Sequence, residues 1–497
     1  MTWLVPLPVV LPLVGAALSI LVGRSRHAQR IVGLSVLVAL VVASTLLLID
    51  VDRNGTLIAE AGAWPAPLGI TLVADRFATV LVLAAGVTLL AVLVYAIGEP
   101  STERNHVGFQ STYLVLAAGI GLSFLTGDLF DLFVAFEMML TASYVLLTLG
   151  GRQAQVRSGM TYIVISLIAS TLFVTALALL YSATGTLNMA DLAVRLDHLP
   201  PGVVTAFAVL LLIVFGIKAA IFPLFFWLPD SYPIAPSPIT AVFAGLLTKV
   251  GVYAIIRTQM VLFTDETRPT TLILVLAGAT MVVGVLGAIA QDDIRRILSF
   301  TIVSQIGYMI MGLAFFSVAG AAAVVFSMIH HIIITTALFV IAGLVDKASG
   351  SNSMSRIGGM VRTTPLLAAM FLVTALSVAG IPPLSGFISK FGLIEAGVAK
   401  DEYAIVAVSL VVTLLTLFSM VRIWIGVFWS PPEETPARPP AAVPSGGGPA
   451  LMVVPTAALV ICSLAVAVAA GPIYAFSEAA ARELIDRSAY IDEVLDP

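Results

Sequence analysis

Long apolar stretches follow one another along almost the whole chain, and short polar segments separate them. Each approaches or exceeds the roughly 20 residues that a helix needs to cross the ~30 Å hydrocarbon core of a membrane. The pattern therefore predicts an all-α polytopic membrane protein with fourteen spans. The predicted spans lie at residues 3–23, 31–49, 77–97, 110–126, 129–149, 158–182, 202–228, 238–261, 270–290, 297–316, 318–345, 365–398, 403–429 and 450–475.

Prolines interrupt two of these spans. The seventh continues into FPLFFWLPDSYPIAPSP, where Pro223 is the first of five prolines, and the twelfth contains AGIPPLSGF with Pro382 and Pro383. Proline removes a backbone donor and clashes with the preceding helical turn. Such breaks persist at membrane depth only where the freed carbonyls meet protein or water. We therefore predict that helices 7 and 12 are broken.

The two breaks fall at the fourth helix of two consecutive sets of five, spans 4–8 and 9–13. Interrupted spans at corresponding places in two halves indicate internal repeats and a transport site. The repeat follows from topology only, because Lys218 precedes its first proline whereas Lys390 follows its pair. The predicted organisation is an N-terminal region at 1–109, a first repeat at 110–261, a second repeat at 270–429, a Pro/Gly-rich loop at 430–449 and a C-terminal region at 450–497.

Composition supports this class and excludes several others. The chain is 60% hydrophobic and 10% charged, whereas soluble domains carry about 25% charged residues. The single cysteine, Cys462, excludes internal disulfides and offers no cluster for a metal or an iron–sulfur group. No long basic run suggests nucleic acid. The amino end lacks a basic region and a cleavage site, so 3–23 is interpreted as a span and not as a removed signal.

The loop charges predict an orientation. With the amino terminus outside, about twelve Lys or Arg fall in cytoplasmic loops and about seven on the outer side, as the positive-inside tendency requires. An even number of spans then returns the carboxyl terminus to the outer side. We expect a multi-pass membrane protein with both termini on the outer side.

Charged residues inside the apolar spans are the main candidates for function. They are Glu137 in span 5, Lys218 in span 7, Lys249 in span 8 and Lys390 in span 12. A charge at mid-membrane costs roughly 2.5–3.5 kcal/mol on insertion scales, so it is rarely without a role. Burial favours the neutral form of a lysine, which can then exchange a proton, whereas an arginine stays charged. A buried carboxylate near an ammonium group can likewise load and release a proton.

His330 and His331 lie in the middle of span 11 and extend this row. An unperturbed imidazole titrates near pH ~6.5, which suits a relay between lysines. Neighbours on a helix point about 100° apart, so one ring is expected to face the path and the other to pack elsewhere. A metal site is not expected, because adjacent histidines diverge and no carboxylate or cysteine accompanies them. The predicted path is Glu137, Lys218, Lys249, His330 or His331, and Lys390.

Simpler interpretations remain open for the same residues. Glu137 could form a structural ion pair, the histidines could be ordinary packing residues, and the lysines, Lys390 above all, could reach to the membrane surface. Arg422 could cap the far end of the path or anchor the chain in an interfacial belt with Trp424 and Trp429.

The remaining charges near the helix ends are interpreted as structural. Asp128 and Asp131 are expected to cap the fifth helix. Asp75 and Arg76 are expected to pair with each other at the surface, and the DDIRR run at 292–296 to form a solvated loop.

These residues resemble the antiporter-like membrane subunits shared by respiratory complex I and the multisubunit Mrp sodium/proton antiporters. The resemblance covers roughly residues 60–430. Its marks are Glu137 in FVAFEMML, Lys218 before a Pro-broken helix, the block FWLPDSYPIAPSPITAVFAGLLTKVGVYA, and GIPPLSGFISKF around Lys390. The resemblance implies fourteen helices with two inverted five-helix repeats, and it places the corresponding glutamate and lysines on the proton pathway.

Within that family, GAWPAPLGITLVADR and TGTLNMADLA are similar to the branch that contains the D subunit of the Mrp antiporters. Phe225 and Tyr232 stand where complex I relatives usually carry histidines. The resemblance implies a proton-translocating transporter subunit without a cofactor, whose partners are other subunits of the complex, H⁺ and Na⁺. Sodium needs oxygen ligands. The chain offers one deep carboxylate, so the sodium site is expected elsewhere or at an interface.

Two other functions fit the same architecture. The chain could be a proton-pumping subunit of complex I or of a membrane-bound hydrogenase. It could also be a scaffold subunit that keeps the fold without conducting protons.

Overall fold

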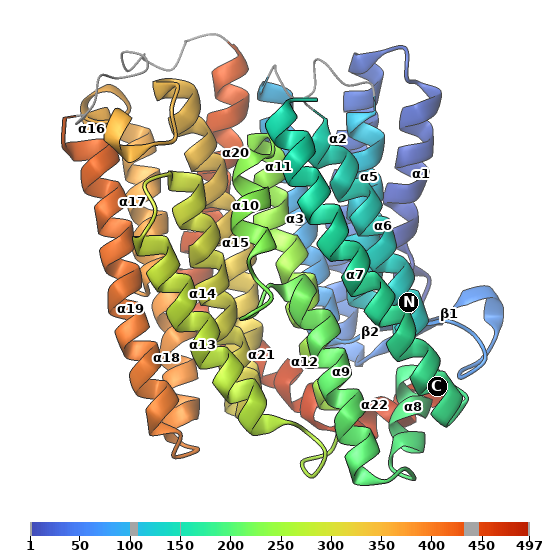
Figure 1. Cartoon of the computed structure of the whole chain (residues 1–497). Coiled ribbons are helices and arrows are strands. Elements are labelled where there is room, and N and C mark those ends of the chain that lie inside the picture. The colour runs from blue at the N-terminus through green and yellow to red at the C-terminus, as the bar shows by residue number, and fades with distance from the viewer. Residues whose placement is uncertain (1, 100–107, 150, 432–446, 496–497) are drawn as a thin grey trace.

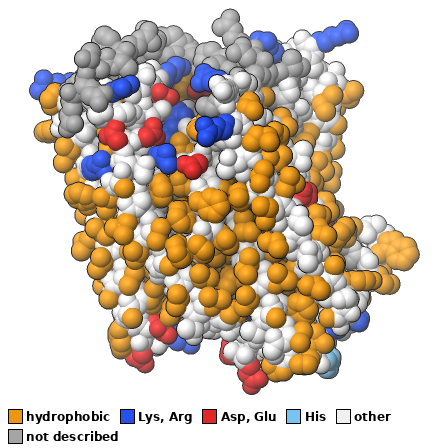
Figure 2. All heavy atoms as spheres, in the orientation of Figure 1, with side chains coloured by type: hydrophobic (Ala, Val, Ile, Leu, Met, Phe, Trp, Pro, Cys, Tyr) orange, Lys and Arg blue, Asp and Glu red, His pale blue; other side chains and the backbone are white. Residues whose placement is uncertain are grey.

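The computed structural model describes residues 2–99, 108–149, 151–431 and 447–495. Most of the chain forms long helices that run side by side, and a small hairpin projects at one edge (Figure 1). Hydrophobic side chains form a broad band around the middle of the visible face, and charged side chains gather above and below it (Figure 2). This distribution is the one expected of a protein surrounded by lipid.

The N-terminal region and the first predicted repeat contain most of the shorter elements. The helices up to residue 261 are α1 Leu7–Leu21, α2 Arg26–Asn54, α3 Arg76–Gly98, α5 Phe109–Leu125, α6 Leu129–Thr148, α7 Gln153–Thr184, α8 Met189–Leu196, α9 Pro201–Ala219, α10 Trp227–Ser231, α11 Ser237–Val242 and α12 Thr248–Val261, with a π turn at Phe243–Leu247 between the last two. The hairpin pairs β1 Leu57–Glu60 with β2 Thr71–Ala74 in antiparallel register.

The second predicted repeat and the C-terminal region follow. Their helices are α13 Thr270–Ile289, α14 Ile294–Ala314, α15 Val318–Ser349, α16 Met360–Thr363, α17 Pro365–Ala379, α18 Ser385–Val398, α19 Tyr403–Ile423 with a π turn at Trp424–Trp429, α20 Gly447–Val468, α21 Ala470–Ile485 and α22 Arg487–Leu495. The end of the bundle where α2, α7 and α14 begin is its upper face. The opposite end, where α3 and α9 begin, is the lower face (Figure 1).

Each predicted span contains a helix among the described residues. Eleven helices there are long and apolar enough to cross a membrane, and Leu7–Leu21, Phe109–Leu125 and Pro365–Ala379 are shorter apolar helices. The predicted all-α polytopic fold is confirmed. Most of the predicted loop 430–449 lies outside the described residues.

The structure corrects the extent of the last span. The sequence predicts span 14 as one helix over 450–475, but α20 ends at Val468 and α21 starts at Ala470. The apolar run continues through this change of direction, so hydrophobicity alone could not locate it.

Both proline-rich spans are interrupted where the sequence predicts. α9 and α17 each end in a residue with left-handed backbone, Ala220 (φ 62°) and Gly380 (φ 84°). The two breaks then continue with the same turn hydrogen bonds. The donors and acceptors are Ala220 N–H to Ile217 O, Ile221 N–H to Gly216 O and Leu224 N–H to Ile221 O in the first, and Gly380 N–H to Ser377 O, Ile381 N–H to Leu376 O and Leu384 N–H to Ile381 O in the second.

A second shared pattern lies at the start of the second helix of each five-helix set. There the backbone pairs with the segment that follows the third helix. The bonds are Leu129 N–H to Leu187 O and Met189 N–H to Gly127 O in the first set, and Ile294 N–H to Asn352 O and Met354 N–H to Asp292 O in the second. Because each set has an odd number of helices, α5 and α13 start at opposite ends of the bundle (Figure 1). Both features favour two inverted repeats.

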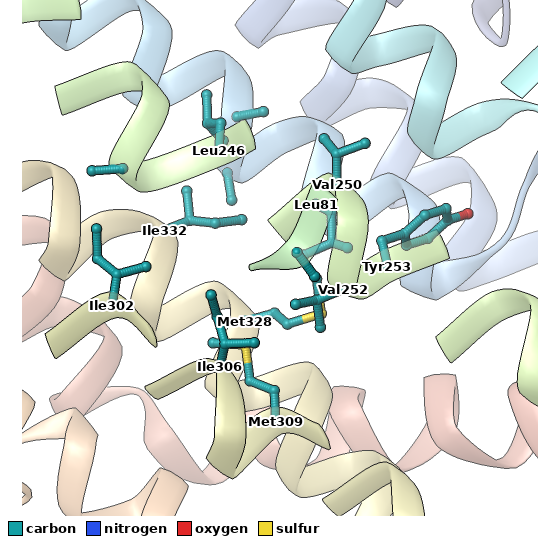
Figure 3. Close-up of a cluster of buried hydrophobic side chains, with 14 of the residues drawn as sticks. Leu81, Leu246, Val250, Val252, Tyr253, Ile302, Ile306, Met309, Met328 and Ile332 are labelled. Carbon is teal, nitrogen blue, oxygen red and sulfur yellow. The ribbon is translucent and has the colours of Figure 1, made fainter. Parts of the chain in front are cut away.

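The helix α15 forms the centre of the bundle. The apolar stretch of this helix is buried along its whole length, and it packs against α3, α14, α17, α18, α20 and α21. Aliphatic side chains from α3, α12, α14 and α15 meet here, among them Val250, Ile306 and Ile332 (Figure 3). This cluster joins the two predicted repeats.

The run at 292–296 is not the solvated loop predicted from its charges, because two of its arginines connect neighbouring segments of the bundle. Arg295 is buried, and its guanidinium donates to Ser237 Oγ at 2.6 Å and to Asp346 Oδ2 at 2.9 Å. The next residue, Arg296, pairs with Asp230 at 2.9 Å. Ser237 and Asp230 belong to the segment after the first break, so these two arginines tie that segment to the second repeat at the upper face.

The predicted pair between Asp75 and Arg76 is wrong. Asp75 caps α3 by accepting from Ala78 N–H, and it forms an ion pair of 2.5 Å with Arg257 of α12. Both partners of this pair are buried. Arg76 instead pairs with Asp52 and with Glu483 of α21. Neighbouring charges at a helix start point in different directions, so each finds a distant partner.

The C-terminal helices α21 and α22 hold the lower face together. The guanidinium of Arg257 lies over the ring of Tyr490 in α22, 5.5 Å from its centroid. Arg487 pairs with Asp197, the residue that follows α8, at 3.0 Å. Together with the bond from Arg76 to Glu483, these contacts connect the C-terminal segment to α3, α8 and α12.

Replacing Arg257 by Met should strongly destabilise the protein. The change leaves Asp75 as a buried carboxylate without its cation, which typically costs about 3–5 kcal/mol. We expect a clearly lower midpoint in thermal unfolding of the purified complex. The control is Arg482→Met, because Arg482 forms an exposed ion pair with Glu478. Equal unfolding midpoints for the two variants would contradict the conclusion that Arg257 stabilises the buried carboxylate of Asp75.

Candidate proton pathway

Glu137 lies near the middle of α6, half-buried among apolar residues. Its carboxylate accepts a hydrogen bond from the hydroxyl of Ser170 in α7. A charge-assisted hydrogen bond of this kind lowers the cost of placing a carboxylate within the membrane. The sequence alone does not identify Ser170, because its partner lies on another helix.

The two aspartates before Glu137 have different roles. Asp128 accepts from Phe130 N–H at 2.7 Å and from Asp131 N–H at 3.1 Å, so it caps α6 as predicted. Burial raises the pKa of the Asp128 carboxyl, and these two hydrogen bonds oppose that change. Asp131 is not a cap. Its side chain is buried, and its Oδ2 has no hydrogen-bond partner within the described residues.

Lys218 lies in the last turn of α9, next to the first break. Its Nζ lies 5.8 Å from the ring centroid of Phe136, the residue before Glu137. The two predicted partners are therefore neighbours, but among the described residues Lys218 and Glu137 do not form a contact ion pair. In this structure the Glu137 carboxylate is therefore not stabilised by a contact ion pair with Lys218.

A small cavity lies beside Lys218. Its volume is 30 Å³, and its walls include Tyr162 and Ser166 of α7 as well as Phe136 and Trp227. Such a volume can hold at least one water molecule when polar groups line it. The hydroxyls of Tyr162 and Ser166 and the ammonium of Lys218 are groups of this kind.

The first break depends on close contact between α9 and α12. A Cβ atom on Gly251 would lie 2.5 Å from the amide nitrogen of Ala219, which is closer than real atoms approach. On the other side, the indole N–H of Trp227 donates to Ile217 O at 2.9 Å. The end of α9 is therefore fixed by a glycine contact and by a side-chain hydrogen bond.

Lys249 is buried at the start of α12, immediately after the π turn Phe243–Leu247. Its Nζ donates to the carbonyl of Ala244, within that turn, at 2.7 Å. Irregular turns of this type occur frequently at functional sites. The ammonium is held inside the bundle and does not reach either face.

His330 and His331 are both buried in α15. Their rings are in contact, with centroids 4.7 Å apart, so the two imidazoles do not diverge as predicted. His330 Nδ1 shares a hydrogen bond of 2.8 Å with Ser385 Oγ, at the start of α18. His330 Nε2 and His331 Nδ1 have no partner among the residues that the structure describes.

Lys390 is buried in α18 and does not reach to the membrane surface. Its Nζ donates to Ala379 O at 3.2 Å, the last residue of α17, and lies 4.8 Å from the ring centroid of Tyr308. The phenol of Tyr308 is itself held by Ser409 O at 2.6 Å. The break after α17 thus supplies an acceptor for the ammonium.

The helices that carry these residues pack in series. α9 packs against α12, the π turn before α12 packs against α15, and α15 packs against α18. Buried polar atoms without a partner among the described residues accompany the series: Thr248 Oγ1, Ser327 Oγ, His330 Nε2, His331 Nδ1 and Ser389 Oγ. Buried polar atoms normally have a partner, often ordered water. The polar atoms in this list can therefore form hydrogen bonds to water molecules between the helices.

Sequence reasoning missed Gln305 of α14. Its amide is buried, and neither its oxygen nor its nitrogen has a partner among the described residues. It lines a cavity of 10 Å³ together with Thr301, Thr335 and Val378. A single glutamine in an apolar span is a signal that could have been used.

The fold and this buried row define a class of protein, namely a polytopic membrane protein with a series of ionisable groups inside its helical bundle. Residues 126–416 match the family described as NADH:quinone oxidoreductase/Mrp antiporter, transmembrane. The chain belongs to this family.

Individual relatives cover the whole chain. It is 45% identical over 494 residues to the D subunit of the Na⁺/H⁺ antiporter of Alkalihalophilus pseudofirmus, which is 99% of each chain. It is 38% identical over 491 residues to the corresponding protein of Bacillus subtilis, with 98% of each chain covered. Among solved structures, a chain of the Mrp complex from a Dietzia species aligns with a TM-score of 0.92 and 32% identity over all of both chains.

Replacing Gly251 by Val should abolish transport, because the new side chain would push the end of α9 and move Lys218 out of the cavity. The measurement is ion exchange in vesicles that contain the assembled complex. Gly202→Ala is the control, since a Cβ at Gly202 meets no atom within 4 Å. Full activity of Gly251→Val in a normally assembled complex would contradict the proposed packing.

Proposed function

We propose that this chain is the proton-translocating subunit of a multisubunit monovalent cation (Na⁺)/proton antiporter in a prokaryotic plasma membrane. The observation that carries the proposal is the position of the lysines. Lys249 and Lys390 are held inside the bundle by carbonyls of interrupted helices, and Lys218 lies beside a cavity. The names of the full-length relatives, which are D subunits of Na⁺/H⁺ antiporters, support the same conclusion.

The proposed path starts at one broken helix and ends at the other. A proton reaches Lys218 through the cavity next to the first break. It then passes to Lys249, to the histidine pair and to Lys390 beside the second break. Proton transfer over such distances needs intervening water, and the unpartnered polar atoms along the series favour its presence.

Glu137 acts as the switch at the start of this path. In the structure its carboxylate is held by Ser170, while the Lys218 ammonium lies over Phe136. A rotation of the Lys218 side chain would bring the two charges together. That pairing favours the charged form of Lys218, and its release favours proton transfer onward to Lys249.

This chain carries the proton half of the exchange. Sodium is a hard cation that binds to several oxygen ligands, whereas the row consists mainly of amines and imidazoles. We propose that the sodium site lies in another subunit or at an interface. The antiporter function also makes this chain a transporter subunit and not a catalytic one.

The proposed orientation places the upper face in the cytoplasm. Basic residues of the predicted cytoplasmic loops, such as Arg26, Arg295 and Lys347, belong to helix ends at this face (Figure 1). The described ends of the chain, Thr2–Leu4 and Arg487–Leu495, lie towards the lower face, so both termini are proposed to be outside.

Replacing Lys390 by Met should reduce sodium/proton exchange to near background, because Met cannot carry a proton. Lys390→Arg should also fail, because arginine keeps its charge throughout the cycle. Exchange is measured in everted vesicles that contain the whole complex. Lys400→Met is the control, since Lys400 lies exposed just after the end of α18. Normal exchange by Lys390→Met would contradict the proposed proton path. It would instead favour the alternative that this chain is a scaffold subunit that does not conduct protons.

Replacing Ser170 by Ala should reduce exchange about tenfold or more without abolishing it. A hydrogen bond to a charged group contributes about 1.5–3 kcal/mol, so its loss changes the balance at Glu137 but leaves the carboxylate in place. Glu137→Gln should have a stronger effect in the same vesicle assay. Ser182→Ala, at an exposed position of the same helix, should leave exchange unchanged. If Ser170→Ala and Ser182→Ala behaved alike, the role of Ser170 would be refuted.

A further inference from the structure

A pocket of 360 Å³ lies at the upper end of α19, away from the lysine row. Its walls come from the end of α19, from the π turn after it, and from the two loops that precede α14 and α16. The lining includes Asp292, Ser355, Phe418, Arg422 and Ile425. The volume is in the range of sites that bind small organic groups.

The pocket contains one charge of each sign. Arg422 donates one hydrogen bond, to Ile289 O, and within the described residues its other N–H groups have no acceptor. Asp292 accepts from the hydroxyls of Ser353 and Ser355 through Oδ2. Among the described residues, Arg422 and Asp292 do not form an ion pair with each other. Both charges therefore remain available to a ligand.

The other side of the pocket is apolar and continues along α19. Phe418, Val421 and Ile425 are 55%, 38% and 48% exposed. Phe418 and Ile425 lie on the same face of the helix as Arg422, because residues three or four positions apart are neighbours. Val421 is three positions from Phe418 and four from Ile425, and it also lines the pocket. Trp429, which is exposed, follows one turn later. Tryptophans of this kind mark the boundary between hydrocarbon and headgroups.

We propose that this pocket binds the headgroup of a zwitterionic aminophospholipid, with its phosphate on Arg422 and its ammonium on Asp292. A guanidinium binds a phosphate with two parallel hydrogen bonds. A primary ammonium group can donate up to three hydrogen bonds to a carboxylate. The acyl chains extend from the pocket past Phe418, in the direction of the lower-numbered residues of α19 and of the centre of the membrane.

The two charges together select this class of lipid. An anionic lipid without an amine would satisfy Arg422 but would leave Asp292 next to added negative charge. A choline lipid carries a quaternary ammonium that cannot donate a hydrogen bond to the carboxylate. The pocket therefore predicts a preference for phosphatidylethanolamine over both phosphatidylglycerol and phosphatidylcholine.

Native mass spectrometry of the purified, delipidated complex tests the proposal. The complex is titrated separately with phosphatidylethanolamine, phosphatidylglycerol and phosphatidylcholine of identical acyl chains. The unmodified complex should retain phosphatidylethanolamine most strongly. Arg422→Gln should weaken its binding about tenfold or more, because a charge-assisted pair of hydrogen bonds is lost. Asp292→Asn should remove the preference over the other two lipids.

Arg157→Gln is the matched control, because Arg157 is an exposed arginine of α7 near the same face. It should leave lipid binding unchanged. The proposal is overturned if Arg422→Gln binds phosphatidylethanolamine as the unmodified complex does, or if the unmodified complex prefers phosphatidylglycerol. It is also overturned if no lipid binds and Arg422→Gln instead releases a neighbouring subunit, since that subunit would then fill the pocket. If the Arg422→Gln complex does not assemble, the test is made with Asp292→Asn alone. An unchanged preference of Asp292→Asn for phosphatidylethanolamine over the other two lipids would then overturn the proposal.

Discussion

A buried ammonium group needs hydrogen-bond acceptors, and inside a regular helix each carbonyl already accepts one bond from an N–H group, so carbonyls at interrupted helices are the more available partners. In this chain the interrupted helices provide them. Lys249 binds the carbonyl of Ala244 within a π turn, and Lys390 binds the carbonyl of Ala379 where α17 stops. The interruptions therefore help to accommodate the charges of Lys249 and Lys390 inside the bundle.

The helices also pack closely at both proline-rich breaks. Gly251 lets α12 approach the backbone of α9, and a Cβ on Gly386 would overlap the carbonyl of Ser377. At both breaks a glycine on the adjacent helix segment takes the place that a side chain would otherwise occupy. The two breaks share this solution and their turn hydrogen bonds. They differ in the lysine, which precedes the break at Lys218 and follows it at Lys390.

Much of the fold and the chemistry of the row could be predicted from the sequence. Apolar runs of sufficient length define membrane helices, and prolines such as Pro223 and Pro382 define where they break. Lys218, Lys249 and Lys390 stand out because charges are rare in such runs. These are local signals, and each can be interpreted within a window of about 20 residues.

The partners of the charges could not be predicted in this way. Ser170 lies on a different helix from Glu137, and Asp75 pairs with Arg257 on α12 instead of its neighbour Arg76. Such pairs depend on tertiary packing, and a single sequence contains no signal for them.

The distribution of satisfied and unsatisfied groups indicates where this protein can change conformation. At the upper face Arg295 ties the segment after the first break to the second repeat, and at the lower face Arg257 and Arg487 bind the C-terminal helices. Between these fixed ends, the polar groups around Lys249 and the two histidines lack part of their hydrogen bonds within the described residues. Proteins tolerate such incompletely satisfied groups mainly where function requires them. Movement of protons and side chains is therefore expected at the centre of the bundle, while its two ends keep the helices in register.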